Sequence, residues 1–348
     1  MELIWFAIVC AMLGAYVALD GFDFGVGIVH RFVARTDDER RTTLAAIGPV
    51  WDGNEVWLIA AGGVLFMAFP RTYSAAFSGF YMALMIVLWL LILRGVAIEF
   101  RGHQANPLWC EFCDTVFSLA SGLLAIVFGA SLGNLVRGVP LNESGLLSMP
   151  LFTDFQPGRE PGILDWYTVL VGFFTLCVLA GHGALYLVWR TTGPVHFRSQ
   201  MCARRAWVAV VPLWVVVTLA TFRVQPEVFQ NLLARPWSAV LVLPTFAGLA
   251  GVFYFMRNGR ELAAFLSSTA FLVGLVAATM AGNYPFWLRS TIDPSFGLTA
   301  SNTASNRYGL QVALVWWAVG IALAAGYFLF LFRWMRGKVA LTHESEGY

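Results

Sequence analysis

Two short acidic motifs contain the residues of this sequence that could do chemistry. Asp20 and Asp23 stand at the end of the first long apolar run, and Asp52 and Glu55 stand at the start of the second. Residues three apart on a helix share a face, so each pair places two carboxylates side by side. Ionisable groups inside a membrane are costly and usually functional, and carboxyl groups at its edge can take up and release protons. The motifs therefore indicate a route for protons.

The elements that must hold these motifs are membrane-spanning helices. The chain has 348 residues, of which 59% are hydrophobic and 12% are charged, whereas soluble domains average roughly 25% charged residues. Its apolar runs are about 17–25 residues long, which is the length that crosses the hydrocarbon core as a helix. Strands of a membrane barrel would instead alternate over segments of ~10 residues. The net charge of +2 gives no indication of nucleic-acid binding.

We predict an all-α, polytopic membrane protein with about nine transmembrane helices, arranged as two four-helix bundles plus one peripheral helix. Residues 1–348 then form a single integral membrane domain, with the first bundle over 1–138, the second over 164–282 and the ninth helix over 309–334. The predicted spans lie near 3–29, 50–70, 74–100, 114–136, 165–189, 206–222, 238–256, 261–282 and 309–332.

The basic residues predict how the chain is oriented in the membrane. Loops on the cytoplasmic side of a membrane protein are richer in Lys and Arg. The loops after the first, third, fifth and seventh spans, together with the C-terminal segment, hold about twice as many Lys and Arg as the other loops. We therefore expect a multi-pass protein of the bacterial cytoplasmic (inner) membrane, with its N-terminus outside and its C-terminus in the cytoplasm.

Charged residues gather at the cytoplasmic ends of the first four predicted spans. The carboxylates and Arg side chains there are Asp20, Asp23, Asp52, Glu55, Glu99, Asp114, Arg94 and Arg101. At low dielectric so many negative charges cannot all be ionised, so some of the carboxyl groups should carry protons. We expect Asp52 and Glu55 to form a proton entrance, and Asp20 and Glu99 are further candidates for the route. The alternative is that some of these residues face headgroup water without a function.

Other polar residues are better explained by structure than by chemistry. Asp23, Arg101 and Asp114 could form a salt-bridged cluster that ties the first, third and fourth spans together. His182 lies between two glycines in the fifth span, where a hydrogen-bonded core histidine is a simpler explanation than a haem ligand. Cys110-Glu111-Phe112-Cys113 lacks the second pair that a structural zinc site needs. We therefore predict no metal site in this chain.

Several motifs of the chain belong together. They are Asp20-Gly21-Phe22-Asp23-Phe24-Gly25-Val26-Gly27, Trp51-Asp52-Gly53-Asn54-Glu55-Val56-Trp57-Leu58 with Ala61-Gly62-Gly63, Ala76-Phe77-Ser78-Gly79-Phe80-Tyr81, Phe128-Gly129 through Gly133-Asn134-Leu135 with Gly138-Val139-Pro140, and Arg336-Gly337-Lys338-Val339. Their joint pattern resembles subunit II of the cytochrome bd quinol oxidases. The similarity covers nearly the whole chain and is densest over the first four spans.

This resemblance implies a reaction and roles for particular residues. The family's enzyme oxidises quinol and reduces dioxygen to water in the cytoplasmic membrane. The resemblance gives Asp52 a part in proton delivery from the cytoplasm, and it makes Asp23, Arg101 and Asp114 a polar cluster in the neighbourhood of a quinone or cation. Glu55 stands where some relatives have Gln.

The resemblance also implies partners. The b-type and d-type haems belong to subunit I, so this chain is expected to bind no haem, to be inactive alone, and to hold at most a structural quinone. We expect subunit I, a small single-span subunit and membrane lipid as its neighbours, with quinol and dioxygen as substrates of the complex.

Two other functions fit the residues alone. A proton-coupled secondary transporter also has about this number of spans, an internal repeat and buried acids. Its charges would gather near the midplane, however, whereas the acids here crowd one face. A purely structural scaffold for a haem-bearing subunit is the third interpretation.

Overall fold

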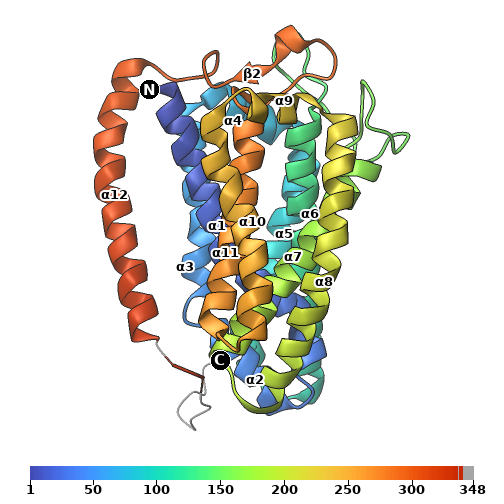
Figure 1. The fold of residues 1–348 in the computed structure, drawn as a ribbon, viewed down its shortest axis with the longest axis vertical. Helices are drawn as coiled ribbons and strands as arrows, with labels where there is room; N and C mark the ends of the chain where they lie inside the picture. Colours follow the sequence, from blue (N-terminus) through green and yellow to red (C-terminus); the bar gives the residue numbers. More distant parts are fainter. Residues whose placement is uncertain (336, 340–348) are drawn as a thin grey trace.

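Long helices that run the height of the molecule form nearly the whole fold. The structure is a computed structural model, and it describes residues 1–335 and 337–339. Short elements close both ends of the bundle (Figure 1). In chain order the elements are α1 (Glu2–Val33), α2 (Asp37–Ile47), α3 (Trp51–Ala68), α4 (Pro70–Gly79), α5 (Tyr81–Phe100), η1 (Arg101–His103), α6 (Pro107–Arg137), α7 (Trp166–Arg190), α8 (Gly193–Val224), α9 (Glu227–Leu233), η2 (Pro236–Ser238), α10 (Ala239–Arg257), α11 (Glu261–Asn283), β1 (Phe286–Leu288), η3 (Pro294–Phe296), β2 (Leu298–Thr299) and α12 (Arg307–Trp334).

The helices confirm the prediction of an all-α, polytopic membrane protein. Among the described residues, 8 helices are long and apolar enough to cross a membrane. The helix α3 packs against α1 but has only 18 residues, and polar side chains occupy its first turn. The predicted number of nine spans therefore depends on α3 and stays a prediction. An odd number agrees with Figure 1, where α1 begins at one end of the bundle and α12 ends at the other.

Several boundaries differ from the predicted ones. The predicted span 74–100 is two helices, α4 and α5, which meet at Phe80. The helix α8 begins at Gly193, far ahead of the predicted 206, because the basic segment before its apolar run is also helical. The helices α2 and α9 were not predicted, because they are too short to cross a membrane. The connection over 283–308 contains the antiparallel pair β1–β2.

The helices α1 and α7 approach each other so closely that only glycine fits between them. A Cβ added to Gly25 would lie 2.0 Å from the carbonyl oxygen of Leu179, and one added to Gly183 would lie 2.2 Å from the backbone carbon of Gly25. Small residues allow such backbone contact between membrane helices, where dispersion forces replace the hydrophobic effect. No larger side chain fits at Gly25 or Gly183 without moving α1 and α7 apart.

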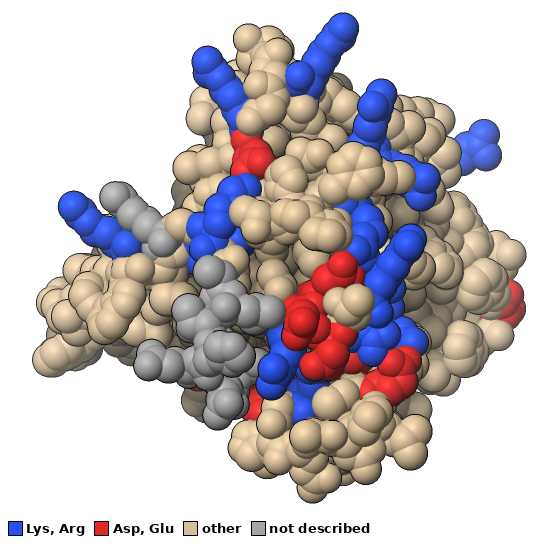
Figure 2. Space-filling model, turned by 90° about the horizontal axis from the view of Figure 1, so that it is seen from below, with Lys and Arg blue, Asp and Glu red and all other residues tan. Residues whose placement is uncertain are grey.

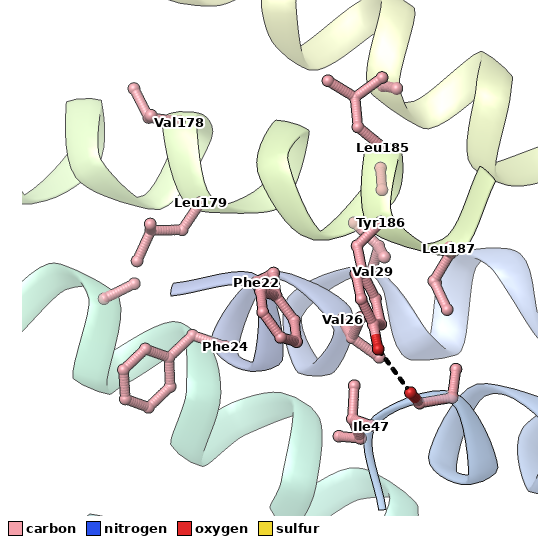
Figure 3. Close-up of a cluster of buried hydrophobic side chains, with 14 of the residues drawn as sticks. Phe22, Phe24, Val26, Val29, Ile47, Val178, Leu179, Leu185, Tyr186 and Leu187 are labelled. Carbon is pink, nitrogen blue, oxygen red and sulfur yellow. Dashed lines mark hydrogen bonds between the residues drawn. The ribbon is translucent and has the colours of Figure 1, made fainter. Parts of the chain in front are cut away.

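Aromatic side chains extend this contact toward α2. Phe22 on α1 stacks on Tyr186 of α7, with ring centroids 4.1 Å apart. The hydroxyl of Tyr186 donates to the carbonyl oxygen of Ala46 at 2.7 Å, as the dashed line in Figure 3 shows. The buried cluster thus fixes α2 beneath the bundle, and α2 in turn fixes where α3 begins.

The two predicted four-helix bundles stay a prediction. The helix α1 contacts α3 and α6 of the first predicted bundle, but it also contacts α7 and α11 of the second. The helix α12 stands beside the body in Figure 1, and its apolar stretch is 0% buried. This exposure agrees with the prediction of a peripheral ninth helix.

Candidate functional site

A buried group of charged side chains lies where α1, α3 and α5 meet. Arg94 of α5 is fully buried, and its Nη2 donates to Oδ1 of Asp20 at 2.6 Å. The same Nη2 lies 3.6 Å from Oε2 of Glu55, whose side chain is 21% exposed. The guanidinium also lies over the ring of Phe24, with its Cζ 4.2 Å from the ring centroid. Arg94 therefore balances one fully buried carboxylate and one that reaches the surface.

Asp23 belongs to this group through Asn54. The amide Nδ2 of Asn54 donates to Oδ2 of Asp23 at 2.8 Å, and both side chains are fully buried. We call Asp20, Asp23, Asn54, Glu55 and Arg94 the Arg94 group.

The Arg94 group contains more polar atoms than the protein satisfies. The second oxygens of Asp20 and Asp23, the amide oxygen of Asn54, and Nε and Nη1 of Arg94 have no hydrogen-bond partner among the described residues. Leaving a buried polar atom unpaired costs about 1–3 kcal/mol, and internal water usually supplies the missing partner. This arrangement suits a small hydrated space within the helix bundle.

Asp52 lies at the surface beside this group. It is exposed in the first turn of α3, while its neighbour Trp51 is buried. Asp52 and Glu55 lie on adjacent positions of one helix face, as their spacing predicts. Exposure falls from Asp52 through Glu55 to Asp20, so the carboxylates form a series that leads from the surface into the protein.

A second charged group surrounds Asp114 at the same end of the molecule. Oδ1 of Asp114 accepts from Nε of Arg101 at 2.6 Å and lies 2.9 Å from Nε2 of His30. Its Oδ2 accepts from Arg40 at 3.0 Å. Asp37 pairs with Arg101, and Glu111 pairs with Arg31 and Arg40. We call His30, Asp37, Arg40, Arg101, Glu111 and Asp114 the Asp114 group.

This end of the molecule faces the viewer in Figure 2, where carboxylates gather beside Lys and Arg side chains. Arg101 and Asp114 meet here as the sequence predicts, but the predicted inclusion of Asp23 is wrong. Asp23 precedes His30 by seven residues, or about 10 Å along a helix. Because α1 continues to Val33, His30 reaches the level of Asp114 and Asp23 remains higher in the bundle.

Glu99 is not joined to either group. It is half-buried near the end of α5, and its side chain has no hydrogen bond or ion pair with the residues that the structure describes. Its backbone oxygen lies 3.0 Å from Nδ1 of His103. Of the predicted proton-route candidates, the structure therefore connects Asp20 to Glu55 through Arg94 and leaves Glu99 apart.

The structure also contains contacts between charged residues that the sequence motifs did not predict. Glu39 of α2 accepts from Arg198 of α8 at 2.5 and 3.0 Å. The hydrogen bonds from Arg198 lower the pKa of the Glu39 carboxyl to about 2. The signal that could locate Glu39 is its capping box with Thr36, which marks the start of α2. No comparable local signal indicates His30 or Asn54.

His182 is placed as a core residue. Its Nδ1 lies 2.7 Å from Oγ of Ser268, and its Nε2 lies 3.0 Å from the carbonyl oxygen of Ala18. Both ring nitrogens thus have hydrogen-bond partners within the protein. Within residues 1–335 and 337–339 no group of three or more His, Cys, Asp or Glu side chains could hold a metal ion.

Comparison with known proteins identifies the family. The sequence model of the family described as cytochrome bd terminal oxidase subunit II matches residues 1–335. The chain belongs to this family. It is 30% identical over 345 residues to cytochrome bd-I ubiquinol oxidase subunit 2 of Escherichia coli strain K12, covering 92% of this chain and 89% of the relative. It is 31% identical over 311 residues to cytochrome bd ubiquinol oxidase subunit 2 of Bacillus subtilis strain 168, covering 89% and 88%.

A solved structure has the same fold. A chain of the bd oxidase from Geobacillus thermodenitrificans superposes with a TM-score of 0.74 at 18% identity, covering 95% of this chain and 97% of that chain. Family membership confirms that the chain is subunit II of a bd-type quinol oxidase, an oxidoreductase complex. It is a multi-pass protein of the inner membrane, and the transporter interpretation is set aside.

Proposed function

We propose that this chain provides the cytoplasmic proton entrance of the oxidase and braces a haem-bearing subunit I. Reduction of dioxygen to water consumes protons, which must reach the reaction from the aqueous phase. The single observation that supports the entrance is the series from exposed Asp52, through Glu55 with 21% of its side chain exposed, to fully buried Asp20. Arg94 connects the last two.

Each member of the series has a property that proton transfer needs. Asp52 is exposed and can collect a proton from water. Glu55 lies one helical turn further on the same face, close enough to receive that proton directly or through one water. Arg94 keeps Asp20 and Glu55 from repelling each other. The unpaired polar atoms of the Arg94 group would hold water that continues the route.

The proposal includes an orientation. The start of α3 and the helix α2 lie at the same end of the bundle (Figure 1). The excess of basic residues in the loops at that end favours the cytoplasm. The N-terminus then lies outside, the end of α12 lies inside, and Asp52 faces the compartment from which protons are taken.

The proposal also assigns cofactors and neighbours. We place the b-type and d-type haems in subunit I, because both nitrogens of the buried His182 are hydrogen-bonded. The apolar stretch of α12 is 0% buried, and Trp89 of α5 is 63% exposed, so both helices need lipid or a partner subunit to cover them. A structural quinone and a small single-span subunit remain part of the proposal from family resemblance.

The test is the substitution Asp52→Asn in the assembled complex. It keeps the size of the side chain and removes the titrating proton. We expect normal haem content with most of the oxygen uptake lost, as measured on the same purified sample. Asp38→Asn, at an exposed position of α2, is the matched control and should keep full turnover. Full turnover in Asp52→Asn at normal haem content would refute the entrance.

A further inference from the structure

A buried arginine at the end of α7 binds the segment that follows α12. Nη1 of Arg190 donates to the carbonyl oxygens of Met335 and Gly337, both at 2.5 Å. The carbonyl oxygen of Arg190 accepts from the backbone N–H of Val339 at 2.7 Å. Gly337 has φ +107°, a conformation that glycine adopts without strain. A larger residue at this position would therefore strain the contact with Arg190.

Lys338 joins the same segment to α11. Its Nζ donates to the carbonyl oxygen of Val188 at 2.9 Å and to Oε2 of Glu261 at 2.5 Å. We call Arg190, Glu261, Met335, Gly337, Lys338 and Val339 the Arg190 group. Gly337 and Lys338 belong to the last of the sequence motifs, whose first residue, Arg336, lies outside the described residues.

The Arg190 group lies beside the start of α3. Phe332 of α12 and Met335 line one small cavity together with Arg190 and Val50, which directly precedes α3. Figure 1 shows that α12 ends at the end of the bundle where α2 lies and α3 begins. Because the apolar stretch of α12 is 0% buried, we expect the polar contacts after its last turn to contribute much of what fixes its position.

The helix α12 covers one face of the first two turns of α3. A Cβ added to Gly53 would lie 3.5 Å from the hydroxyl oxygen of Tyr327 and 3.9 Å from Cζ of Phe328. The rings of Phe328 and Trp57 have centroids 5.9 Å apart. Gly53 and Trp57 are four residues apart and share a face of α3, whereas Glu55 lies on the opposite side. The start of α3 is therefore held between α12 and the Arg94 group.

The start of α3 has little support of its own. Its N-cap residue, Val50, forms no side-chain cap hydrogen bond, and uncapped N–H groups weaken the first turn of a helix. Among residues 51–57 only Trp51 and Asn54 are buried, and Asp52 is exposed. The contact with α12 should therefore decide how firmly Asp52 is held.

We propose that the Arg190 group holds α12 against α3 and thereby positions the first turn of α3 for proton uptake. Arg190 is then a positioning residue, which acts on Asp52 through α12. This inference rests on the proton entrance proposed above. When the Arg190 group is disrupted, the end of α12 moves away from α3 and the first turn of α3 opens more often. Asp52 and Glu55 then no longer keep the spacing that a helix imposes on them.

The test compares three variants of the purified two-subunit complex. Lys338→Met removes the donor to Glu261, and Gly337→Ala strains the turn that Arg190 binds. Both positions are exposed, so these variants should still fold, whereas Arg190 is buried and is left unchanged. Arg333→Gln is the matched control. Arg333 is exposed in the last turn of α12 and has no ion pair or side-chain hydrogen bond within the described part of the chain.

The first measurement is hydrogen–deuterium exchange in peptides that cover 50–57 and 328–335. Exchange reports how often a segment opens. The loss of a charge-assisted hydrogen bond should make both peptides exchange roughly tenfold faster in Lys338→Met. Gly337→Ala should act in the same direction, and Arg333→Gln should leave exchange unchanged. Unchanged exchange over 50–57 in both Lys338→Met and Gly337→Ala would overturn the proposal.

The second measurement is oxygen uptake by the same samples. A displacement of about 1 Å can cost roughly 100-fold in rate, and partial opening of α3 costs less, so we expect turnover to fall severalfold. The solvent isotope effect should rise because proton delivery becomes slower, while haem content and the KM for quinol stay unchanged. Faster exchange with full turnover, or lower turnover with an unchanged isotope effect, would overturn the proposal. Exchange is measured without turnover, so full activity in Asp52→Asn would refute the entrance without altering the result for α12.

Discussion

Replacing Arg94 alone should destabilise the protein more than replacing Arg94 and Asp20 together. Both side chains are fully buried, and they are joined at 2.6 Å. Arg94→Gln removes the cation and leaves Asp20 as a buried carboxylate without its partner, which costs about 3–5 kcal/mol. Arg94→Gln with Asp20→Asn leaves two neutral amides in the same space, which avoids the buried charge.

The structure sets the size of the expected difference. Glu55 lies further from Arg94, at 3.6 Å, and its side chain is 21% exposed, so water relieves the loss of its cation. Most of the penalty in Arg94→Gln therefore comes from Asp20, and the second substitution should recover roughly 2–3 kcal/mol of it. This recovery equals roughly a 30- to 150-fold change in the ratio of folded to unfolded protein.

The assay is reversible denaturation of the purified complex in mixed detergent micelles. Arg41→Gln is the control, because Arg41 pairs with Asp37 at 3.9 Å and both side chains are exposed. Such a surface pair contributes only about 0–1 kcal/mol. If Arg94→Gln were no less stable than Arg41→Gln, or if the double variant were less stable than the single one, Arg94 and Asp20 would not form a coupled buried pair.

Three further predictions concern the rest of the chain. Arg101→Ala should destabilise the protein by an amount near the lower end of about 3–5 kcal/mol, because Asp114 keeps two other donors, and it should lower the yield of assembled complex. A normal yield and normal thermal stability would argue against a buried ion pair between Arg101 and Asp114. The pKa of Glu39 in the folded protein is lowered to about 2, so Glu39 should stabilise the fold above the usual carboxyl pKa and lose this effect as pH falls toward 2. Glu39→Gln should therefore make the free energy of unfolding depend less on pH over that range. An unchanged pH dependence in Glu39→Gln would show that the contact with Arg198 contributes nothing there. The chain purified without subunit I should show no stoichiometric haem spectrum, and a spectrum that His182→Ala removes would contradict the core position of His182.

The membrane helices could be predicted because their signal is local. Apolar runs and basic loops require no knowledge of which helices are neighbours, and the long helices lie where these patterns predict, except at α4 and at the starts of α6 and α8. The differences at the end of α1 and at the starts of α6 and α8 share one cause. Hydropathy measures whether a segment prefers lipid to water, so it does not report where a helix continues into the aqueous layer, as α1 does to Val33.

The partners of the charged residues could not be predicted in the same way. Asp20, Asp23 and Arg94 are visible in the sequence, but the choice of partner depends on the height and rotation of each helix. His30 lies about two turns beyond Asp23 on α1, so His30 becomes the partner of Asp114 and Asp23 is left to Asn54. Burial is equally non-local, because Asp20 is fully buried only in the packed bundle, where the side chain of Arg94 reaches it from α5.

The degree of pairing separates the two charged groups by role. Both oxygens of Asp114 accept hydrogen bonds from cationic side chains, so protonating Asp114 would break contacts that join α1, α2, α6 and η1. The Arg94 group instead keeps unpaired oxygens on Asp20 and Asp23 within the described structure, so a proton or a water can be added there without breaking a contact. A rigid connection between helices needs carboxylate oxygens that are all paired, and a proton route needs oxygens that remain free to accept a proton or a water. The same end of one bundle can therefore hold a rigid anchor and the proposed proton entrance, with Glu55 and Asp52 leading only to the latter.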